Sequence, residues 1–285
     1  ECIHQQSAQQ FARWGDALAR ALGEPLVLDY VPRVPPTTAL TLVARQNYRE
    51  HSDEPTAILR FAWPAQGGGA LRGHGLAHFS AGDLVGIVAP GSAVPRYYSL
   101  ASGWKDGFLE ICVRLLPGGL CSTHLLGLQR GDSIAAFIRS NPGFALPRTR
   151  RPVLLIGAGT GVAPLAGFIR RNDRHTPMHL YFGGRDPAQD FYFGTEIQQW
   201  LGEGRLARVQ TVFSRIPEGG GYVQDALRRD AERVRALVAQ GAVVRVCGSR
   251  AMAKGVAEAL DAILVPLHLS VAQLKAKERY AEDVF

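Results

Sequence analysis

A glycine-rich turn at residues 157–161, with the sequence Gly-Ala-Gly-Thr-Gly, lies between an apolar run and a segment of helical composition. Glycines let a backbone approach phosphate closely, and the free N–H groups at the start of a helix attract anions. The turn therefore predicts a pyrophosphate site at Gly159, Thr160 and Gly161. A tight turn that binds no ligand is the alternative.

Arg96, Tyr97, Tyr98 and Ser99 form a second group of residues with useful chemistry. On a strand, Arg96 and Tyr98 project to one face while Tyr97 and Ser99 project to the other. An arginine can pair with phosphate, a tyrosine ring can stack on a flat heterocycle, and a hydroxyl can reach a ring nitrogen. A cross-strand aromatic ladder explains the same pattern without a ligand.

Small residues also precede a helical segment that we expect over 124–128. This run, Gly-Gly-Leu-Cys-Ser-Thr at 118–123, is a second possible anion cradle because a helix start carries a positive dipole end.

The last residues of the chain place an aromatic ring, Phe285, two positions after Asp283. Chain ends are usually frayed and polar, so this tail indicates a ring delivered to a planar cofactor. A C-terminal strand whose last side chain plugs the core is the alternative. Cys247 ends a predicted strand, at the edge where open α/β sheets bind ligands. A buried cysteine there can equally be a small core residue.

The elements that position these groups follow two different patterns of apolar and polar residues along the chain. Short alternating runs separated by Gly, Pro and Asp predict an antiparallel β barrel over residues 38–147. The runs span 38–48, 56–63, 84–90, 96–102, 108–116 and 133–139.

From residue 148 to 285, strands alternate with helices, which predicts a doubly wound parallel sheet in an α/β domain. Strands are expected over 152–159, 178–184, 205–214 and 242–248, and helices over 161–172, 191–201, 223–240 and 251–264.

The N-terminal segment, residues 1–37, contains a predicted helix over 11–22 and a proline-rich linker over 25–36. The first residue is Glu1, so we expect the chain to be a piece of a longer protein. The segment is interpreted either as the tail of an upstream flavodoxin-like domain or as a simple extension.

The composition of the chain is that of a globular protein with two domains. The chain has 285 residues, 46% of them hydrophobic, which is enough for two domains. The uncharged stretch over 152–169 contains glycines and prolines, so it is interpreted as strand, turn and helix instead of a membrane span. The four cysteines show no C-x-x-C spacing, so neither a metal site nor a redox pair is expected, and reduced thiols fit a cytoplasmic compartment.

The net charge of +7 is concentrated in the second part of the chain, where 20 basic residues face 14 acidic ones from residue 148 onward. A nucleic-acid surface, an arginine-rich dinucleotide site and an acidic protein partner each explain that excess.

Six motifs in fixed order carry a resemblance to a known family. They are RYYSLAS, GGLCST, GAGTGVAP, FSR followed by GYVQDAL, VCGSRAMAKGV and ERYAEDVF. In this order they resemble the ferredoxin–NADP⁺ reductase family over residues 38–285. The similarity is closest to the FAD/NADPH reductase module of diflavin reductases, such as NADPH–cytochrome P450 reductase and the sulfite reductase flavoprotein.

The resemblance implies an FAD site in the barrel domain. It makes Arg96 a ligand of the FAD pyrophosphate, stacks Tyr98 on the isoalloxazine and brings the Ser99 hydroxyl near flavin N5. The remaining residues implied for FAD, from the same two motifs, are Tyr97, Gly119, Leu120, Cys121 and Ser122.

The resemblance also implies an NADP site in the α/β domain. Arg185 would join the glycine-rich turn at the NADP pyrophosphate. Ser214, Arg215 and Tyr222 match the positions that hold the 2′-phosphate, and Gln224 follows them. A guanidinium with two hydroxyl neighbours suits a dianionic phosphate, whereas NADH sites usually place a carboxylate there. An ordinary surface arginine is the alternative for Arg215.

The implied catalytic group is Ser99, Cys247 and Asp283 beside the nicotinamide, with Phe285 covering the flavin. None of these residues needs to be a strong acid or base, because the two cofactors carry the hydride chemistry. Departures from the family's pattern include the missing connecting insertion before Arg96, a glycine at 184 in place of cysteine, and phenylalanine as the final ring.

The implied function is an NADPH-dependent flavoprotein reductase that passes electrons to an FMN or flavodoxin-like domain, or to an iron–sulfur or haem acceptor. A direct reductase of a small acceptor, such as a ferric chelate, quinone or dye, is one alternative. A non-catalytic nucleotide-binding or assembly module is another. Neither nucleic acid nor membrane contact is expected of this fragment, while a membrane anchor in a parent chain is left open.

Overall fold

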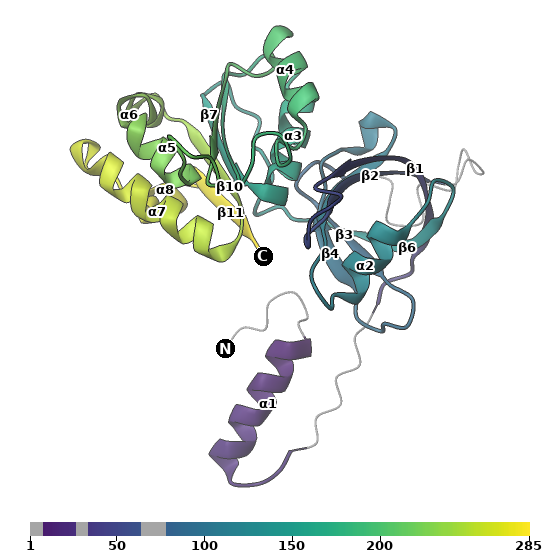
Figure 1. The fold of residues 1–285 in the computed structure, drawn as a ribbon. Helices are drawn as coiled ribbons and strands as arrows, with labels where there is room; N and C mark the ends of the chain where they lie inside the picture. The colour runs from purple at the N-terminus through teal and green to yellow at the C-terminus, as the bar shows by residue number, and fades with distance from the viewer. Residues whose placement is uncertain (1–7, 27–33, 64–77) are drawn as a thin grey trace.

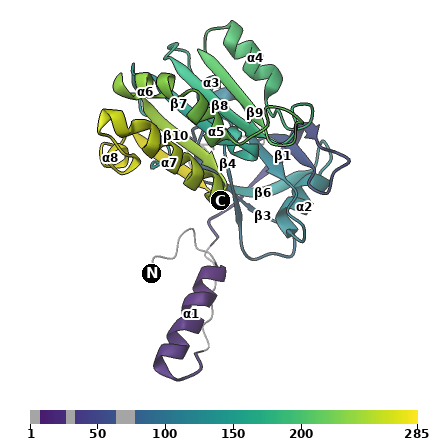
Figure 2. The ribbon, with the colours of Figure 1, turned by 60° about the vertical axis from the view of Figure 1, so that its left-hand side comes forward.

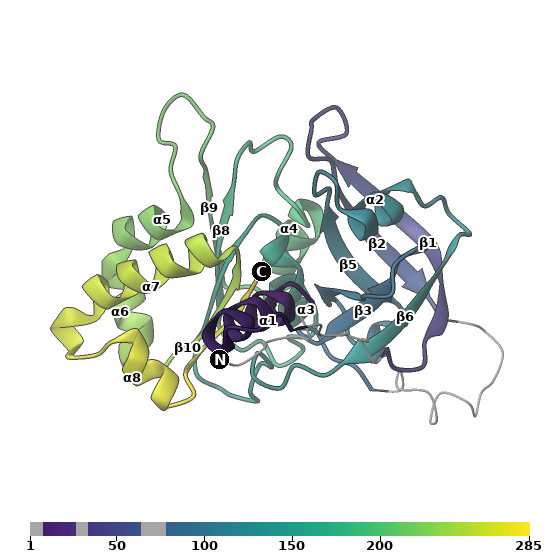
Figure 3. The ribbon, with the colours of Figure 1, turned by 90° about the horizontal axis from the view of Figure 1, so that it is seen from below.

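The computed structural model describes residues 8–26, 34–63 and 78–285. Two sheets organise this part of the chain, one antiparallel and one parallel. Figure 1 shows them side by side, with the C-terminus lying between them. The view from below in Figure 3 places the C-terminus in the same position.

The first sheet is antiparallel and six-stranded, in the order β4-β3-β6-β1-β2-β5. Its strands are β1 (Thr38–Tyr48), β2 (Thr56–Ala62), β3 (Leu84–Val88), β4 (Arg96–Ser99), β5 (Leu109–Arg114) and β6 (Ser133–Arg139). The chain just after β4 meets the other edge strand, because the Ala101 N–H donates to the Glu110 carbonyl at 2.8 Å. The predicted antiparallel barrel is confirmed.

The interior of the barrel holds the apolar residues that alternate along its strands. Leu40, Leu59, Phe61 and Ile111 are fully buried in this core. Helix α2 (Leu120–Gly127) packs on the same core through residues such as Leu125. It begins four residues earlier than expected, because Gly119 is already its N-cap. A 3₁₀ turn covers Trp104–Asp106.

The second sheet is parallel and five-stranded, in the order β11-β10-β7-β8-β9. Its strands are β7 (Val153–Ala158), β8 (Met178–Gly184), β9 (Arg208–Phe213), β10 (Val243–Gly248) and β11 (Tyr280–Val284). The strand order reverses between β7 and β10, which makes the sheet doubly wound, as predicted. Four consecutive residues of β7, from Val153 to Ile156, are fully buried, as expected of a strand covered on both faces.

Helices cover both faces of this sheet, and Figures 1 and 2 show the two layers. Helices α3 (Val162–Arg170) and α4 (Gly194–Gly202) lie on the face toward the barrel. The opposite face carries α5 (Val223–Arg229), α6 (Ala231–Ala239), α7 (Arg250–Leu264) and α8 (Val271–Ala276). Two further 3₁₀ turns cover Gly159–Gly161 and Val265–Leu267.

One predicted helix is wrong as a single element. The segment 223–240 is divided at Asp230, which ends α5 and begins α6. The Tyr181 hydroxyl donates to the Asp230 carboxylate at 2.6 Å, and Arg208 lies 3.3 Å from it. These sheet residues fix Asp230 at the break, a tertiary contact that helical periodicity does not reveal.

The two sheets share an interface built around α3. A Cβ atom on Gly167 would lie 2.7 Å from the Ala101 carbonyl oxygen, so glycine permits this close approach. Beside it, the fully buried Glu110 accepts hydrogen bonds from Arg60 of the barrel and Arg170 of α3, at 2.7 and 2.5 Å. The halves therefore meet through both close packing and a buried ion network.

Helix α1 (Ala8–Leu22) contains the predicted N-terminal helix and begins three residues earlier. Residues 1–7 and most of the predicted linker lie outside the described residues. The domain boundaries at 37 and 147, and the interpretation of residues 1–37, remain predictions. In the part of the chain that the structure describes, no helix combines the length and the apolar character needed to cross a membrane.

Candidate functional site

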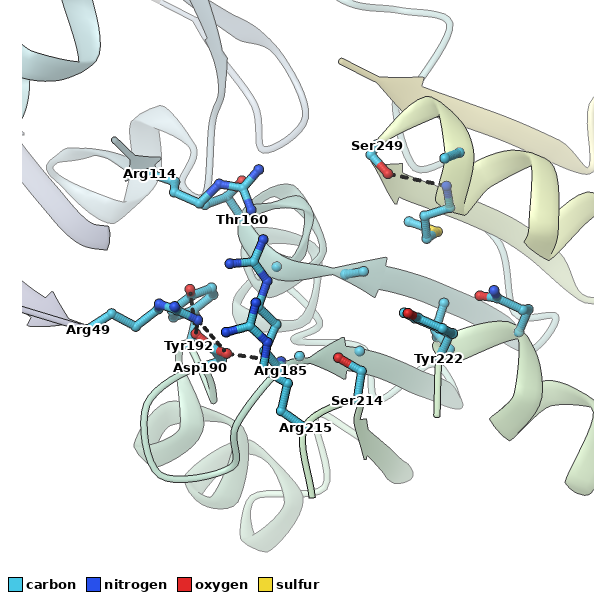
Figure 4. A pocket seen from close by; sticks show the side chains of 18 of the residues that line it. Arg49, Arg114, Thr160, Arg185, Asp190, Tyr192, Ser214, Arg215, Tyr222 and Ser249 are labelled. Atoms are coloured by element: carbon cyan, nitrogen blue, oxygen red, sulfur yellow. Dashed lines mark hydrogen bonds and ion pairs between the residues drawn. The ribbon is translucent and has the colours of Figure 1, made fainter. Parts of the chain in front are cut away.

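A cavity of about 700 Å³ opens at the carboxyl ends of β7 and β8, and Figure 4 shows it from close by. Eight of the residues predicted to bind a cofactor line it: Gly159, Thr160, Arg185, Ser214, Arg215, Tyr222, Gln224 and Phe285. They come from segments up to 126 residues apart in the sequence (285 − 159). The structure thus brings the predicted dinucleotide residues together in one space.

The glycine-rich turn forms one wall of this cavity. Gly159 adopts a left-handed backbone with φ of 55°, which favours glycine. Gly161 is buried, and a Cβ atom there would lie only 2.2 Å from the Cys247 carbonyl oxygen. The absence of a side chain at 161 therefore lets the turn pack against the end of β10.

Four arginines line the cavity, two from each half of the protein. Figure 4 shows Arg49 and Arg114 entering from the barrel side, and Arg185 and Arg215 extending from the α/β side. The Arg49 guanidinium is 3.2 Å from both carboxylate oxygens of Asp190, which is almost completely buried. The cavity is therefore strongly basic, and both halves contribute to its charge.

The loops that carry Arg185 and Arg215 run side by side. The Arg215 N–H donates to the Arg185 carbonyl at 2.8 Å, and the Ser214 N–H donates to the Gly184 carbonyl at 3.1 Å. The predicted pyrophosphate arginine and the predicted 2′-phosphate arginine are thus held as neighbours.

Tyr222 and Gln224 complete this side of the cavity. Tyr222 precedes α5 and is exposed, with its backbone N–H donating to Asp225 at 2.9 Å. The Gln224 side-chain oxygen is buried and has no hydrogen-bond partner among the described residues.

The three predicted catalytic residues Ser99, Cys247 and Asp283 also come together. Cys247 pairs with Asp283 across the parallel strands β10 and β11, and the Ser99 hydroxyl donates to Asp283 at 2.6 Å. Burial raises the pKa of Asp283, and the hydrogen bond from Ser99 partly opposes this. Burial, followed by the charge of Asp283, also raises the pKa of Cys247, so its sulfur is a neutral thiol.

Phe285 ends the chain directly after β11 and lines the cavity. Its backbone N–H donates to the Gly248 carbonyl at 3.2 Å, yet the residue is 59% exposed. The predicted strand is present in the tail, but the alternative of a core plug is wrong because the ring is not buried.

The motif at β4 presents its residues as the strand pattern predicts. Arg96 is exposed, and Tyr98 is half-buried against Cys121 of α2. Burial and the neighbouring Cys121 both raise the pKa of Tyr98. Tyr97 packs edge-on against Phe137 with ring centroids 6.0 Å apart. Tyr97 thus takes part in a cross-strand aromatic contact, while Tyr98 of β4 lies against the start of α2.

The start of α2 is shaped by its small residues. A Cβ atom on Gly119 would lie 2.9 Å from the Leu116 carbonyl oxygen, so the turn excludes a side chain. The Ser122 hydroxyl accepts from the Leu116 N–H and donates to the Gly119 carbonyl, both at 3.1 Å. Leu120 is exposed and Cys121 is buried. The predicted FAD contacts of this group remain predictions.

Each half of the protein matches a known protein family. Residues 70–137 match the family model of the oxidoreductase FAD-binding domain, and residues 155–258 match that of the oxidoreductase NAD-binding domain. The motif order and the two-sheet fold agree with both matches. The chain belongs to the ferredoxin–NADP⁺ reductase family.

Curated relatives place this family member near the diflavin reductases. NADPH oxidoreductase A of Dictyostelium discoideum is 34% identical over 228 residues, covering 71% of this chain and 36% of that protein. The sulfite reductase [NADPH] flavoprotein alpha-component of Neisseria meningitidis is 32% identical over 233 residues, covering 73% and 38%.

Inducible nitric oxide synthase of Cavia porcellus is 34% identical over 224 residues, covering 67% of this chain and 20% of that protein. The chain thus spans between about a fifth and two fifths of the length of these relatives. The predicted class, a flavoprotein oxidoreductase module with one domain for FAD and one for a nicotinamide dinucleotide, is confirmed.

The residues of this reductase module fit the two cofactors. Four guanidinium groups and a glycine-rich turn suit an anionic dinucleotide in the cavity. The exposed Arg96, the half-buried ring of Tyr98 and the glycine cradle before α2 suit a flavin nucleotide. Among the described residues, no cluster of three or more His, Cys, Asp or Glu side chains is arranged to hold a metal ion.

Several cavity residues were not predicted from the sequence. Arg49, Arg114 and Asp190 belong to no recognised motif and reach the cavity through the packing of the two halves. Ser249 could have been predicted, because it lies in the VCGSR motif. In the structure it caps α7 by accepting a hydrogen bond from the Met252 N–H at 3.2 Å. For the three others, the sequence carries no signal, because Arg49 and Arg114 lie outside the basic part of the chain and Asp190 is acidic.

Proposed function

We propose that the chain is the NADPH-oxidising module of a longer diflavin-type reductase. When bound, NADPH supplies a hydride to FAD, and the flavin releases single electrons to an acceptor. The cavity residues hold the dinucleotide, and Arg215 with Ser214 and Tyr222 selects the 2′-phosphate. The charge-assisted hydrogen bonds of a guanidinium to a dianion favour NADPH over NADH.

The observation that carries this proposal is the meeting of Ser99, Cys247 and Asp283 at the junction of the two halves. Ser99 belongs to the predicted flavin motif, while Cys247 lies one residue before the end of β10, the strand next to the glycine-rich turn. Asp283 connects them, through its bond to Ser99 and its pairing with Cys247. These groups would align the two rings and exclude water from the space between them.

Asp283 has a second role in this proposal. Its carboxylate, when ionised, favours positive charge on the oxidised nicotinamide through electrostatics alone. The neutral Cys247 thiol fills the remaining space and takes no proton. A non-catalytic module would have no need to bring these three side chains together.

We also propose the acceptor: an FMN or flavodoxin-like domain of the same parent chain. The relatives are longer proteins, among them a sulfite reductase flavoprotein and a nitric oxide synthase, and the α/β half of this chain is basic. Flavodoxin-like partners are expected to be acidic, so charge complementarity would guide docking. Three cysteines that are free and buried, Cys112, Cys121 and Cys247, support a reducing, cytoplasmic location.

Two acceptors tested side by side distinguish the proposal from its alternative. The FAD-loaded protein, reduced with NADPH, is mixed with an isolated acidic FMN domain or with a ferric chelate. We expect rapid reduction of the FMN domain that slows with increasing salt, because the encounter is electrostatic. Rapid, salt-independent reduction of the chelate together with an inert FMN domain would favour direct reduction of a small acceptor.

A further inference from the structure

An acidic residue of the barrel half, Glu54, holds one arginine of the dinucleotide cavity. Glu54 lies in the turn between β1 and β2, and its Oε2 accepts a hydrogen bond from Nη1 of Arg185. Arg185 directly follows β8 and lines the cavity. The contact therefore joins the two halves through a residue that is predicted to bind the pyrophosphate.

Glu54 is surrounded by positive charge. The hydrogen bond from Arg185 holds the pKa of Glu54 below its usual value, against an opposing effect of burial. The charges of Arg114 and Arg49 act in the same direction as Arg185. All three arginines line the cavity, so one carboxylate lies among the cations that an anionic ligand would use.

The second carboxylate at this junction, Asp190, is held differently. It accepts hydrogen bonds from the backbone N–H groups of Arg185 and Asp186, both at 2.9 Å, and from the Tyr192 hydroxyl at 3.1 Å. Together with Arg49, these contacts fix a side chain that is only 3% exposed. Asp190 is therefore a permanent part of the fold.

Glu54 is the exchangeable carboxylate of the two. Its side chain is 30% exposed, and its partner Arg185 is 34% exposed, so both can exchange this contact for another. Solvent screens an ion pair whose two side chains are each about a third exposed, so the Glu54 contact costs little to break. An anion that enters the cavity can therefore compete for the Arg185 guanidinium.

We propose that Glu54 is an internal anion that occupies Arg185 until the diphosphate of a nicotinamide dinucleotide displaces it. This inference rests on the function proposed above. The diphosphate and the carboxylate both need the Arg185 guanidinium, and they repel each other if both stay close to it. Glu54 therefore weakens dinucleotide binding and promotes product release. Because NADPH and NADH share the diphosphate, Glu54 sets affinity without setting the choice between them.

Two nucleotide fragments separate this role from a general effect of charge. ADP carries the diphosphate without a 2′-phosphate, and 2′-AMP carries the 2′-phosphate without a diphosphate. Their binding to the FAD-loaded protein is measured by titration calorimetry, which needs no turnover. In Glu54→Gln we expect ADP to bind about two- to fivefold more tightly, as for the loss of an exposed competing ion pair. Binding of 2′-AMP should change by less than that.

Matched variants complete the test. Glu203→Gln removes a carboxylate that also pairs with an arginine, Arg205 at 2.9 Å, but that does not line the cavity, so ADP binding should stay unchanged. Glu54→Asp keeps the charge and shortens the reach to Arg185, so it should also tighten ADP binding. Thermal unfolding of each variant verifies that the fold is retained.

Unchanged or weaker ADP binding in Glu54→Gln would overturn the inference, and so would equal tightening of ADP and 2′-AMP. Wild-type affinity for ADP in Glu54→Asp would also overturn it, because the charge alone would then explain the effect. A wild-type protein that binds neither ADP nor NADP⁺ would instead refute the proposed function itself. The two failures are therefore distinguishable.

Discussion

The Ser99 hydroxyl donates a 2.6 Å hydrogen bond to the Asp283 carboxylate, although the two residues are 184 positions apart. Ser99 ends β4 of the barrel, and Asp283 lies in the last strand of the parallel sheet. This bond fixes the C-terminal strand against the proposed flavin motif.

Replacing Asp283 by asparagine should increase the free energy of unfolding at neutral pH, relative to the wild type. Burial raises the pKa of Asp283 in the folded state. Its contribution to stability is therefore fully present below the unfolded pKa of about 3.9 and is lost as the pH rises through the folded pKa. An asparagine side chain at this position would avoid the cost of a buried charge and could still accept the Ser99 hydrogen bond.

Chemical denaturation of both proteins across the acidic to neutral range measures this effect. The stability advantage of Asp283→Asn over the wild type should shrink as the pH falls toward 4. The variant should also react with NADPH more slowly than the wild type does. Glu282→Gln is the control, because the neighbouring carboxylate is exposed and pairs with Lys275 at the surface. A stability difference for Asp283→Asn that does not vary with pH would contradict the prediction.

Removing the aromatic side chain of the last residue tests the role of Phe285. Phe285 is 59% exposed, so Phe285→Ala should change the free energy of unfolding by less than about 0.5 kcal/mol. A buried phenylalanine would cost about 3–5 kcal/mol. If the ring covers the flavin, its loss should also increase the rate with NADH relative to NADPH, because the displacement that the 2′-phosphate helps to drive would no longer be needed. Lower stability with unchanged cofactor preference would refute the shield.

Arg215→Ala should weaken NADP⁺ binding while leaving NAD⁺ binding nearly unchanged. Hydrogen bonds to charged groups contribute about 1.5–3 kcal/mol, which corresponds to roughly a 10- to 150-fold loss of affinity. Arg228→Ala is a suitable control, because Arg228 pairs with Asp225 on α5 and does not line the cavity. If both nucleotides lost affinity equally, Arg215 would bind a group other than the 2′-phosphate.

Two glycines of the same turn should respond differently to alanine. A Cβ atom on Gly161 would meet the Cys247 backbone at 2.2 Å, so Gly161→Ala should cost at least about 1–3 kcal/mol in stability. A Cβ atom on Gly159 would have no neighbour within 4 Å, so its cost is the left-handed backbone alone, about 1–2 kcal/mol. Thermal unfolding of both variants checks the order, and a smaller loss at 161 than at 159 would contradict the packing argument.

Local patterns were sufficient to predict most of the fold. The β1 and β6 strands match their expected bounds, because alternation and flanking turn residues determine them. The glycine-rich turn was equally predictable from the sequence, since a strand, three glycines and a helix lie next to each other in the chain. The helix break at Asp230 was not predictable from the local sequence, because the residues that contact Asp230, Tyr181 and Arg208, come from the strands β8 and β9.

The same distinction applies to the site. Arg215 and Ser214 follow a strand end within a recognisable motif, so the sequence identified them. Arg49 and Glu54 lie in a turn of the barrel half, and only the packing of that half against the α/β half brings Arg49 to Asp190 and Glu54 to Arg185. Contacts of this kind depend on how two separately folded sheets meet, which no local pattern encodes.

The most direct test of the account is anaerobic reduction of the FAD-loaded protein by NADPH and by NADH, followed at the flavin absorbance in a stopped-flow instrument. We expect a yellow protein that bleaches with NADPH roughly tenfold faster or more, equivalent to about 1.4 kcal/mol or more of selective interaction with the 2′-phosphate. A colourless protein that cannot be reconstituted with FAD would contradict the account, and so would equal rates with the two nucleotides.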